Sequence, residues 1–120
     1  MKLVRFGPPS KEKPGLIDKN GRIRDLSAHI ADIAGVNLTA AGRAAIAALD
    51  IERLEVADAD ARIGPAVGQI GKIICVGLNY SDHAAEAGMA TPKEPVIFAK
   101  ATSAVSGPFD DVLLPRGAEQ

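Results

Sequence analysis

The feature that most constrains the fold is a short apolar run, Ile73 to Val76, which lies between Gly71 and Gly77. A run of this length that is rich in β-branched residues and bounded by glycines is typical of a buried strand. Gly77 can adopt backbone conformations that other residues avoid, so the chain can turn directly after the strand. The sequence therefore predicts a buried strand that ends in a tight turn.

A short helix is predicted after this turn. The side chain of Asn79 or of Ser81 can accept a hydrogen bond from a free amide at the helix start. Asp82 is favourable in a first turn, where the helix dipole is positive. Gly88 is suited to the end of the helix, because the residue there often takes a left-handed conformation.

Two polar residues of this predicted helix, His83 and Glu86, are candidate catalytic residues. Residues three apart share a helix face, with Cβ atoms about 5–6 Å from each other. A carboxylate beside an imidazole fixes the tautomer and raises the basicity of the ring, which a general base requires. A solvated or structural histidine is the more frequent role for such a residue, so both roles stay open on the residues alone.

The stretch from Gly77 to Glu86, Gly-Leu-Asn-Tyr-Ser-Asp-His-Ala-Ala-Glu, resembles the signature of the fumarylacetoacetate hydrolase family. The residues from Glu94 to Ser103, and the Gly107-Pro108 step after them, are also similar to that family. The opening strand, Lys2 to Phe6, followed by Glu12 to Gly15, resembles the small N-terminal domain of longer bacterial members. Those members include diketo-sugar-acid hydrolases and proteins labelled ureidoglycolate lyase.

The resemblance implies an α+β fold with two parts. A small N-terminal domain of a β-hairpin and helices would cover residues 1–68. The beginning of a catalytic domain, a mixed β-roll of the family type, would cover residues 69–120. The residues favour a boundary in the same region, because Gly, Pro and small polar residues gather between Ala57 and Gly71.

The resemblance also implies roles for particular side chains. It implies catalytic roles, as a general base and as the partner that orients this base, for two residues: His83 and Glu86. It implies substrate-binding roles for four others: Asn79, Tyr80, Lys100 and Ser103. A solvated surface lysine is an equally open role for Lys100 on the residues alone.

No metal ligand is expected within these 120 residues. In the family, a Glu-x-Glu cluster and a later Asp hold a divalent cation, and they follow a segment similar to Leu113 to Gly117. No Glu-x-Glu occurs after Glu86, and the sequence stops at Gln120. We therefore expect an N-terminal fragment of an enzyme that uses Mg²⁺ or Mn²⁺, with the ligands beyond Gln120 and no activity in the fragment alone.

The resemblance implies a hydrolase that cleaves a C–C bond in acylpyruvate-like 2,4-diketo acids. Its partners would be a small 2-oxo or diketo acid and, at full length, a second copy in a homodimer. One alternative is a lyase, hydratase or isomerase of the same family that acts on ureidoglycolate or a 2-oxo diacid. The other is a truncated interaction module without catalysis.

Composition and charge narrow the partners, the location and the cysteine chemistry that we expect for this chain. A formal net charge of −1, without a basic cluster among aromatic residues, predicts no nucleic-acid partner. No apolar run approaches 18 residues, so no membrane span is predicted. The N-terminus lacks the apolar core of a signal peptide, which favours the cytoplasm. Cys75 is the single cysteine, and we expect it to be a small buried side chain.

Elsewhere the chain shows ordinary folding signals. Lys2 to Phe6 suits a half-buried strand, and the Asn20-Gly21 pair predicts a hairpin with strands at 15–18 and 22–25. Helices are predicted at 27–34 and 40–49, with the caps Ser27 and Thr39, and one more turn at 51–54 with Asp50 as its cap.

The C-terminal part carries three more signals. Buried strands are predicted at 96–98 and 112–114, since both runs are apolar. Asp110 and Asp111 could pair on a metal, but adjacent strand residues face opposite sides. A turn over residues 107–110 is the favoured alternative.

Overall fold

The computed structural model describes residues 1–88, 90 and 92–118, except for the side chains of residues 83 and 84. The chain divides into two compact units. The first contains Met1–Gln69 and the residues from Ser106 onward, and the second contains Ile70–Val105. Each unit is described by itself below. The predicted domain division between residues 68 and 69 stays a prediction.

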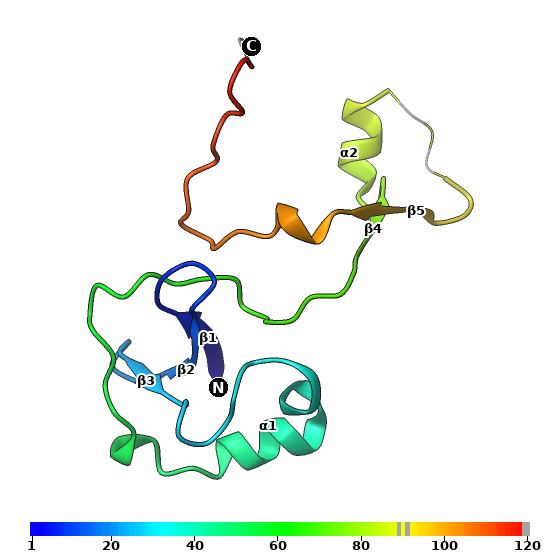
Figure 1. Cartoon of the computed structure of the whole chain (residues 1–120). Coiled ribbons are helices and arrows are strands. Elements are labelled where there is room, and N and C mark those ends of the chain that lie inside the picture. Colours follow the sequence, from blue (N-terminus) through cyan, green and yellow to red (C-terminus); the bar gives the residue numbers. More distant parts are fainter. Residues whose placement is uncertain (89, 91, 119–120) are drawn as a thin grey trace. The chain divides into compact units, whose positions relative to one another are not determined.

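The first unit is built on an antiparallel sheet of three strands, β1 (Lys2–Phe6), β2 (Lys13–Ile17) and β3 (Ile23–Asp25), in that order (Figure 1). β1 matches its predicted bounds. The predicted hairpin forms, with strands at 13–17 and 23–25 in place of 15–18 and 22–25. Gly21 has a positive φ of 80°, a conformation that its lack of a Cβ permits. The Asn-Gly signal therefore predicted the turn correctly.

Both outer edges of this sheet are partly paired. Along β1, the amide of Gly7 donates to the carbonyl of Arg62, and the amide of Gly64 donates to the carbonyl of Arg5, each at 2.8 Å. Along β3, residues 55–57 pair in the same manner, with the Ala57 amide 2.8 Å from the Ile23 carbonyl. Paired edges leave few free backbone groups for strands of other molecules.

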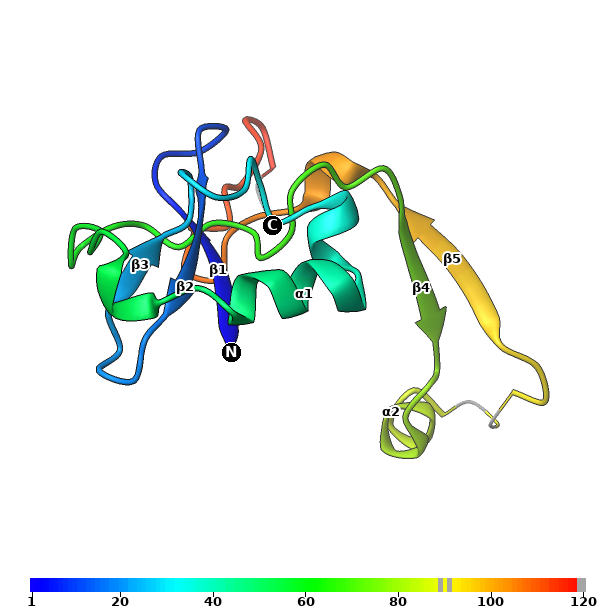
Figure 2. The ribbon, with the colours of Figure 1, turned by 90° about the horizontal axis from the view of Figure 1, so that it is seen from below.

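The core of the first unit joins the sheet to α1 (Ala40–Ala47), which lies beside it (Figure 2). As predicted, the Thr39 hydroxyl caps α1 by accepting the amide of Gly42 at 3.1 Å. Short 3-10 helices, η1 (Gly35–Leu38) and η2 (Ile51–Arg53), flank α1, and the predicted cap Asp50 begins η2. Four side chains that are at most 8% exposed form the core cluster: Leu16, Leu26, Ile46 and Leu54.

The helix predicted at residues 27–34 is wrong, because the chain there forms a turn. The Asp25 carboxylate accepts the amide of Ser27 at 2.7 Å, and the Asp32 carboxylate accepts the amide of Ile33 at 2.7 Å. Short acidic side chains that bind nearby amides compete with helical hydrogen bonds. The turn brings Ile33, which is 2% exposed, into the interior. His29 lies exposed in this turn.

The second unit is an antiparallel ribbon of β4 (Ile73–Gly77) and β5 (Val96–Lys100), with α2 (Ser81–Glu86) between them in sequence and η3 (Thr102–Ala104) after them. The strands and the short helix were predicted. Gly88, with a φ of 64°, follows α2 and donates to the carbonyl of Ala85 at 3.0 Å. The predicted glycine stop is therefore confirmed.

The predicted burial of both strands is wrong in this chain. Ile74 is 66% exposed, Ile97 is 61% exposed and Phe98 is 45% exposed. Cys75 is only partly buried. A two-stranded ribbon has no second layer of structure to cover its faces, so its apolar side chains remain in solvent.

The stretch after the second unit differs from its prediction in one of two places. The turn at Gly107 to Asp110 forms, with the Asp110 amide 3.3 Å from the Gly107 carbonyl. The predicted strand at 112–114 is wrong, because these residues have no strand partner and are each more than 80% exposed. Taken together, the described elements confirm a mixed α+β composition.

Candidate functional site

The predicted catalytic residues lie on α2, directly after β4. Gly77 ends the strand, and Leu78 takes a left-handed φ of 50°, which redirects the chain toward the helix. Positions 83 and 86 are three apart in α2, so they share a helix face. The side chain of His83 lies outside the described part of the structure, and Glu86 is exposed. The helix therefore gives positions 83 and 86 the spacing that was predicted, and the catalytic roles of His83 and Glu86 stay predictions.

Asn79 and Tyr80 lie in the short connection between β4 and α2. Both are exposed, and Tyr80 is 71% exposed. An exposed tyrosine offers an apolar ring and a hydroxyl to a ligand without first breaking core contacts. The structure thus brings Asn79 and Tyr80 next to the helix that carries positions 83 and 86.

Lys100 is the last residue of β5, and Ser103 lies in η3, which follows β5. In the strand register, Gly77 is opposite Val96, where α2 leaves, whereas Ile73 is opposite Lys100. Four residue steps along a strand correspond to roughly 14 Å. The second unit therefore does not place Lys100 and Ser103 beside α2, although both are exposed.

An open hollow of about 720 Å³ runs along the Lys100 end of the ribbon. Its lining combines apolar side chains such as Phe98 with two cationic residues, Lys72 and Lys100, and with Thr102. Such a lining suits a small anion with an apolar part. Lys72 was not a sequence candidate. The pairing of β4 with β5 could have indicated it, since Lys72 immediately precedes the strand residue opposite Lys100.

Within the described residues, no group of three or more His, Cys, Asp or Glu side chains could hold a metal ion. Asp110, a candidate of the rejected metal pairing, is bound by Arg62 instead, at 2.6 Å from each of its carboxylate oxygens. The hydrogen bond from Arg62 lowers the pKa of Asp110. The described residues therefore do not fit a divalent cation.

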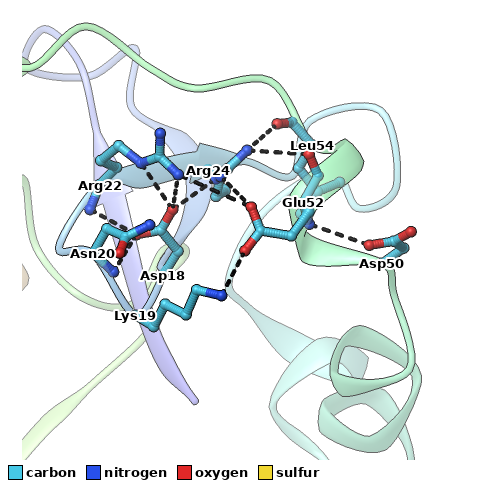
Figure 3. A network of polar contacts seen from close by, with 8 residues as sticks. All are labelled: Asp18, Lys19, Asn20, Arg22, Arg24, Asp50, Glu52 and Leu54. Carbon is cyan, nitrogen blue, oxygen red and sulfur yellow. Dashed lines mark hydrogen bonds and ion pairs between the residues drawn. The ribbon is translucent and has the colours of Figure 1, made fainter.

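A network of polar contacts surrounds Asp18 in the first unit (Figure 3). The Asp18 carboxylate accepts the amides of Asn20 and Arg22 at 2.8 and 3.0 Å, and the guanidinium of Arg24 at 2.9 Å. Burial alone would raise the pKa of Asp18, but these hydrogen bonds outweigh burial and lower it. The carboxylate is thus held in its charged form inside the hairpin.

Arg24 connects this hairpin to η2. Its guanidinium donates to the carbonyl of Leu54 and to the carboxylate of Glu52, each at 2.9 Å. Among the described residues, no buried side-chain polar atom lacks a hydrogen-bond partner. The Asp18 cluster is therefore saturated by its own contacts, which indicates a structural role rather than a ligand site.

None of the helices in the described part of the chain has the length and apolar character that a membrane span needs.

Sequence comparisons match the part of the chain that contains α2 to a known family. The family model described as "Fumarylacetoacetate (FAA) hydrolase C-terminal" matches residues 72–120. A protein of Burkholderia multivorans is 56% identical over 118 residues, and proteins of Burkholderia cenocepacia and Burkholderia ambifaria are 55% and 54% identical over 118 residues. Each of these three relatives carries the name "Putative hydrolase".

The alignments cover 98% of this chain but 42% of each relative, so the chain spans less than half the length of the proteins it matches. The family match begins one residue before β4 and includes every sequence-predicted site residue. Residues 72–120 therefore match the model of the fumarylacetoacetate hydrolase family, the same family that the sequence from Gly77 to Glu86 resembles.

Proposed function

We propose that these residues belong to a divalent-metal-dependent hydrolase that cleaves a C–C bond in acylpyruvate-like 2,4-diketo acids. The observation that carries the proposal is the position of residues 83 and 86 one helical turn apart on α2, within the family match. The name of the relatives supports hydrolysis in general. The choice of diketo acids comes from the resemblance of Gly77 to Glu86 to the family signature.

The proposed chemistry assigns one proton transfer to this chain. His83 removes a proton from water, and the resulting hydroxide adds to the acyl carbonyl of the substrate. The C–C bond then breaks, and its electron pair becomes the enolate of the remaining 2-oxo acid. Protonation of that enolate completes the reaction. Glu86 orients the imidazole and stabilises its charged form after the first transfer.

The remaining site assignments rest on different support. Asn79 and Tyr80 adjoin α2, and their exposure leaves them able to contact a substrate there. Lys100 and Ser103 lie at the far end of the ribbon, so their assignment to a substrate oxygen rests on the family resemblance. Among the described residues, no group of three or more His, Cys, Asp or Glu side chains forms a cation site, so these residues do not by themselves support the proposed Mg²⁺ or Mn²⁺.

We also propose that a full-length protein completes a mixed β-roll around β4 and β5, forms a homodimer and works in the cytoplasm. The support for the β-roll is the exposure of apolar side chains on both strands of the ribbon, such as Ile74 and Ile97. A sheet layer over the ribbon would bury them.

The test uses a protein of the relatives' length that contains these 120 residues. Acetylpyruvate is supplied, and acetate and pyruvate are quantified with Mg²⁺, with Mn²⁺ and with a chelator. We expect metal-dependent release of both products in equal amounts. Turnover of ureidoglycolate, with acetylpyruvate left intact, would instead establish the lyase alternative. No turnover of either compound in metal-loaded, folded protein would contradict the proposal.

A further inference from the structure

The chain that follows the second unit is attached to the first unit by a two-point ion pair. The Nε and Nη2 atoms of Arg62 each lie 2.6 Å from one oxygen of the Asp110 carboxylate. A guanidinium and a carboxylate that meet through two parallel hydrogen bonds are restricted in direction as well as in distance. This contact joins residues 48 positions apart in the sequence.

Arg62 is fixed by contacts other than Asp110. Its Nη1 atom donates to the carbonyl of Gly7 and to the carboxylate of Glu12, each at 3.0 Å. The Glu12 side chain is 7% exposed and also pairs with Arg5 at 3.7 Å, and Arg5 in turn binds Asp32 at 2.7 Å. The guanidinium is therefore oriented by the first unit and needs little ordering when Asp110 binds.

The turn that carries Asp110 is shaped for close contact. Its carboxylate accepts the amide of Gly107 at 2.6 Å. Gly107 is buried, and a Cβ placed there would lie 2.5 Å from the carbonyl oxygen of Ile63. Only glycine permits that approach of the two backbones. The close backbone contact at residue 107 and the ion pair at residue 110 are linked by this hydrogen bond, and both bring the same turn to the residues next to Arg62.

We propose that Arg62 and Asp110 form a strap within the first unit that holds residues 107–110 against residues 62–63, so that the chain entering and the chain leaving the second unit both continue into held parts of the first unit. The strap closes a long loop of chain, which restricts the separation that its two ends can reach. Beyond the turn, residues 111–118 are exposed, so no other buried contact in this described stretch would replace the strap. The inference concerns chain attachment and does not depend on the proposed reaction.

The decisive comparison is between Asp110→Asn and Asp111→Asn in the 120-residue chain. The substitutions remove the same charge from adjacent residues. Asp110 binds Arg62, whereas Asp111 is exposed and takes part in none of the ion pairs among the described residues. Chymotrypsin cleavage after Phe109, inside the turn, reports release of the strap. Cleavage after Leu113, which lies outside the turn and is 84% exposed, serves as the internal reference in each variant.

We expect Asp110→Asn to raise the rate of cleavage after Phe109, relative to Leu113, by about 10-fold or more, because a charge-assisted hydrogen-bonded pair is lost. Residue 110 adjoins the cleaved bond, so each ratio is first divided by the ratio measured on a synthetic peptide of residues 105–118 with the same substitution. Asp111→Asn should leave this ratio within about twofold of the original chain. Equal ratios in the two variants would overturn the proposal. Amide hydrogen exchange in β1 and β2 is measured in parallel, and a comparable increase there in Asp110→Asn would also overturn it, since the contact would then stabilise the whole first unit.

A steric variant gives a second check. Gly107→Ala keeps every charge but places a Cβ 2.5 Å from the Ile63 carbonyl oxygen and 2.9 Å from a carboxylate oxygen of Asp110. We expect it to raise the same cleavage ratio without changing exchange in β1 and β2. A ratio equal to that of the original chain would show that residues 107–110 are not held against Ile63, and would contradict the strap.

Discussion

The two units of the chain have similar local structure but differ in what they bury. The first unit packs β2, α1 and η2 around Leu16, Ile46 and Leu54, and these core side chains are at most 8% exposed. In the second unit, no residue whose exposure is described is buried. Its ribbon nevertheless contains the stronger strand sequences, with Ile74 and Ile97 among its most exposed apolar residues.

This difference shows that forming a strand and burying it have separate requirements. β-Branched runs and flanking glycines favour β4 and β5 locally, and antiparallel pairing needs only the two segments. Burial requires another layer, which α1 and η2 provide in the first unit. Among its described residues, the second unit adds to the two strands only the six-residue helix α2 and the three-residue 3-10 helix η3. Its sequence therefore suits a protein in which further structure covers the ribbon.

The largest expected effect is on kcat, and it distinguishes His83 in the second unit from His29 in the first. In a protein of the relatives' length, His83→Ala should lower kcat by about 10²- to 10⁴-fold, the usual range for a positioned general base. His29→Ala in the first unit is the matched control and should leave kcat near the original value, because His29 lies exposed in a turn. Steady-state kinetics on acetylpyruvate measures both.

Glu86→Gln tests whether the two residues of α2 act together. The amide keeps the shape but lacks the charge that supports the imidazolium, so kcat should fall by a similar or smaller factor. The double variant should lose far less than the product of the single effects, since paired residues act as a unit. Near-original kcat in His83→Ala would leave His83 as a structural residue and remove the functional contrast between the units.

A second prediction compares core and ribbon directly in the 120-residue chain. Leu16→Ala should lower the free energy of unfolding by about 2–5 kcal/mol, because Leu16 is 1% exposed and its removal leaves a cavity. Ile97→Ala should change it by no more than about 0.5 kcal/mol, as for most exposed positions. Urea unfolding followed by far-ultraviolet circular dichroism measures both. Similar losses would mean that the ribbon is covered in solution, for example by self-association.

The smallest expected effect is a loss of folding stability of the first unit at acid pH. The pKa of Asp18 is lowered in the folded chain, so Asp18 contributes stability above its unfolded pKa of about 4. That stability should be lost progressively as the pH falls below about 4. Urea midpoints at pH 7 and pH 3 measure the change.

Asp18→Asn provides the control for this acid response. It lacks the titrating group, so its midpoint should vary less between the two pH values. Some variation should remain, because the pKa of Glu12 is also lowered: burial opposes ionisation of Glu12, but the hydrogen bond from Arg62 and nearby charge favour it. An equal pH dependence in both proteins would exclude Asp18 as a source of the acid response.

The sequence by itself determined the features that depend on near neighbours. The Asn20-Gly21 turn, the caps Thr39 and Asp50 and the glycine stop at Gly88 each involve partners within about four residues. A short segment therefore contains all the information that these features need. The same holds for the family resemblance, which a continuous motif carries.

Only the tertiary structure decided which distant residues meet. It replaced the expected helix at 27–34 by a turn that delivers Ile33 to the interior, and it gave Asp110 the partner Arg62 from 48 positions away. It also placed Lys100 at the end of the ribbon opposite to α2. Such pairings depend on the path of the whole chain and on strand register, because ion pairs and core contacts require proximity in space that local sequence patterns do not specify.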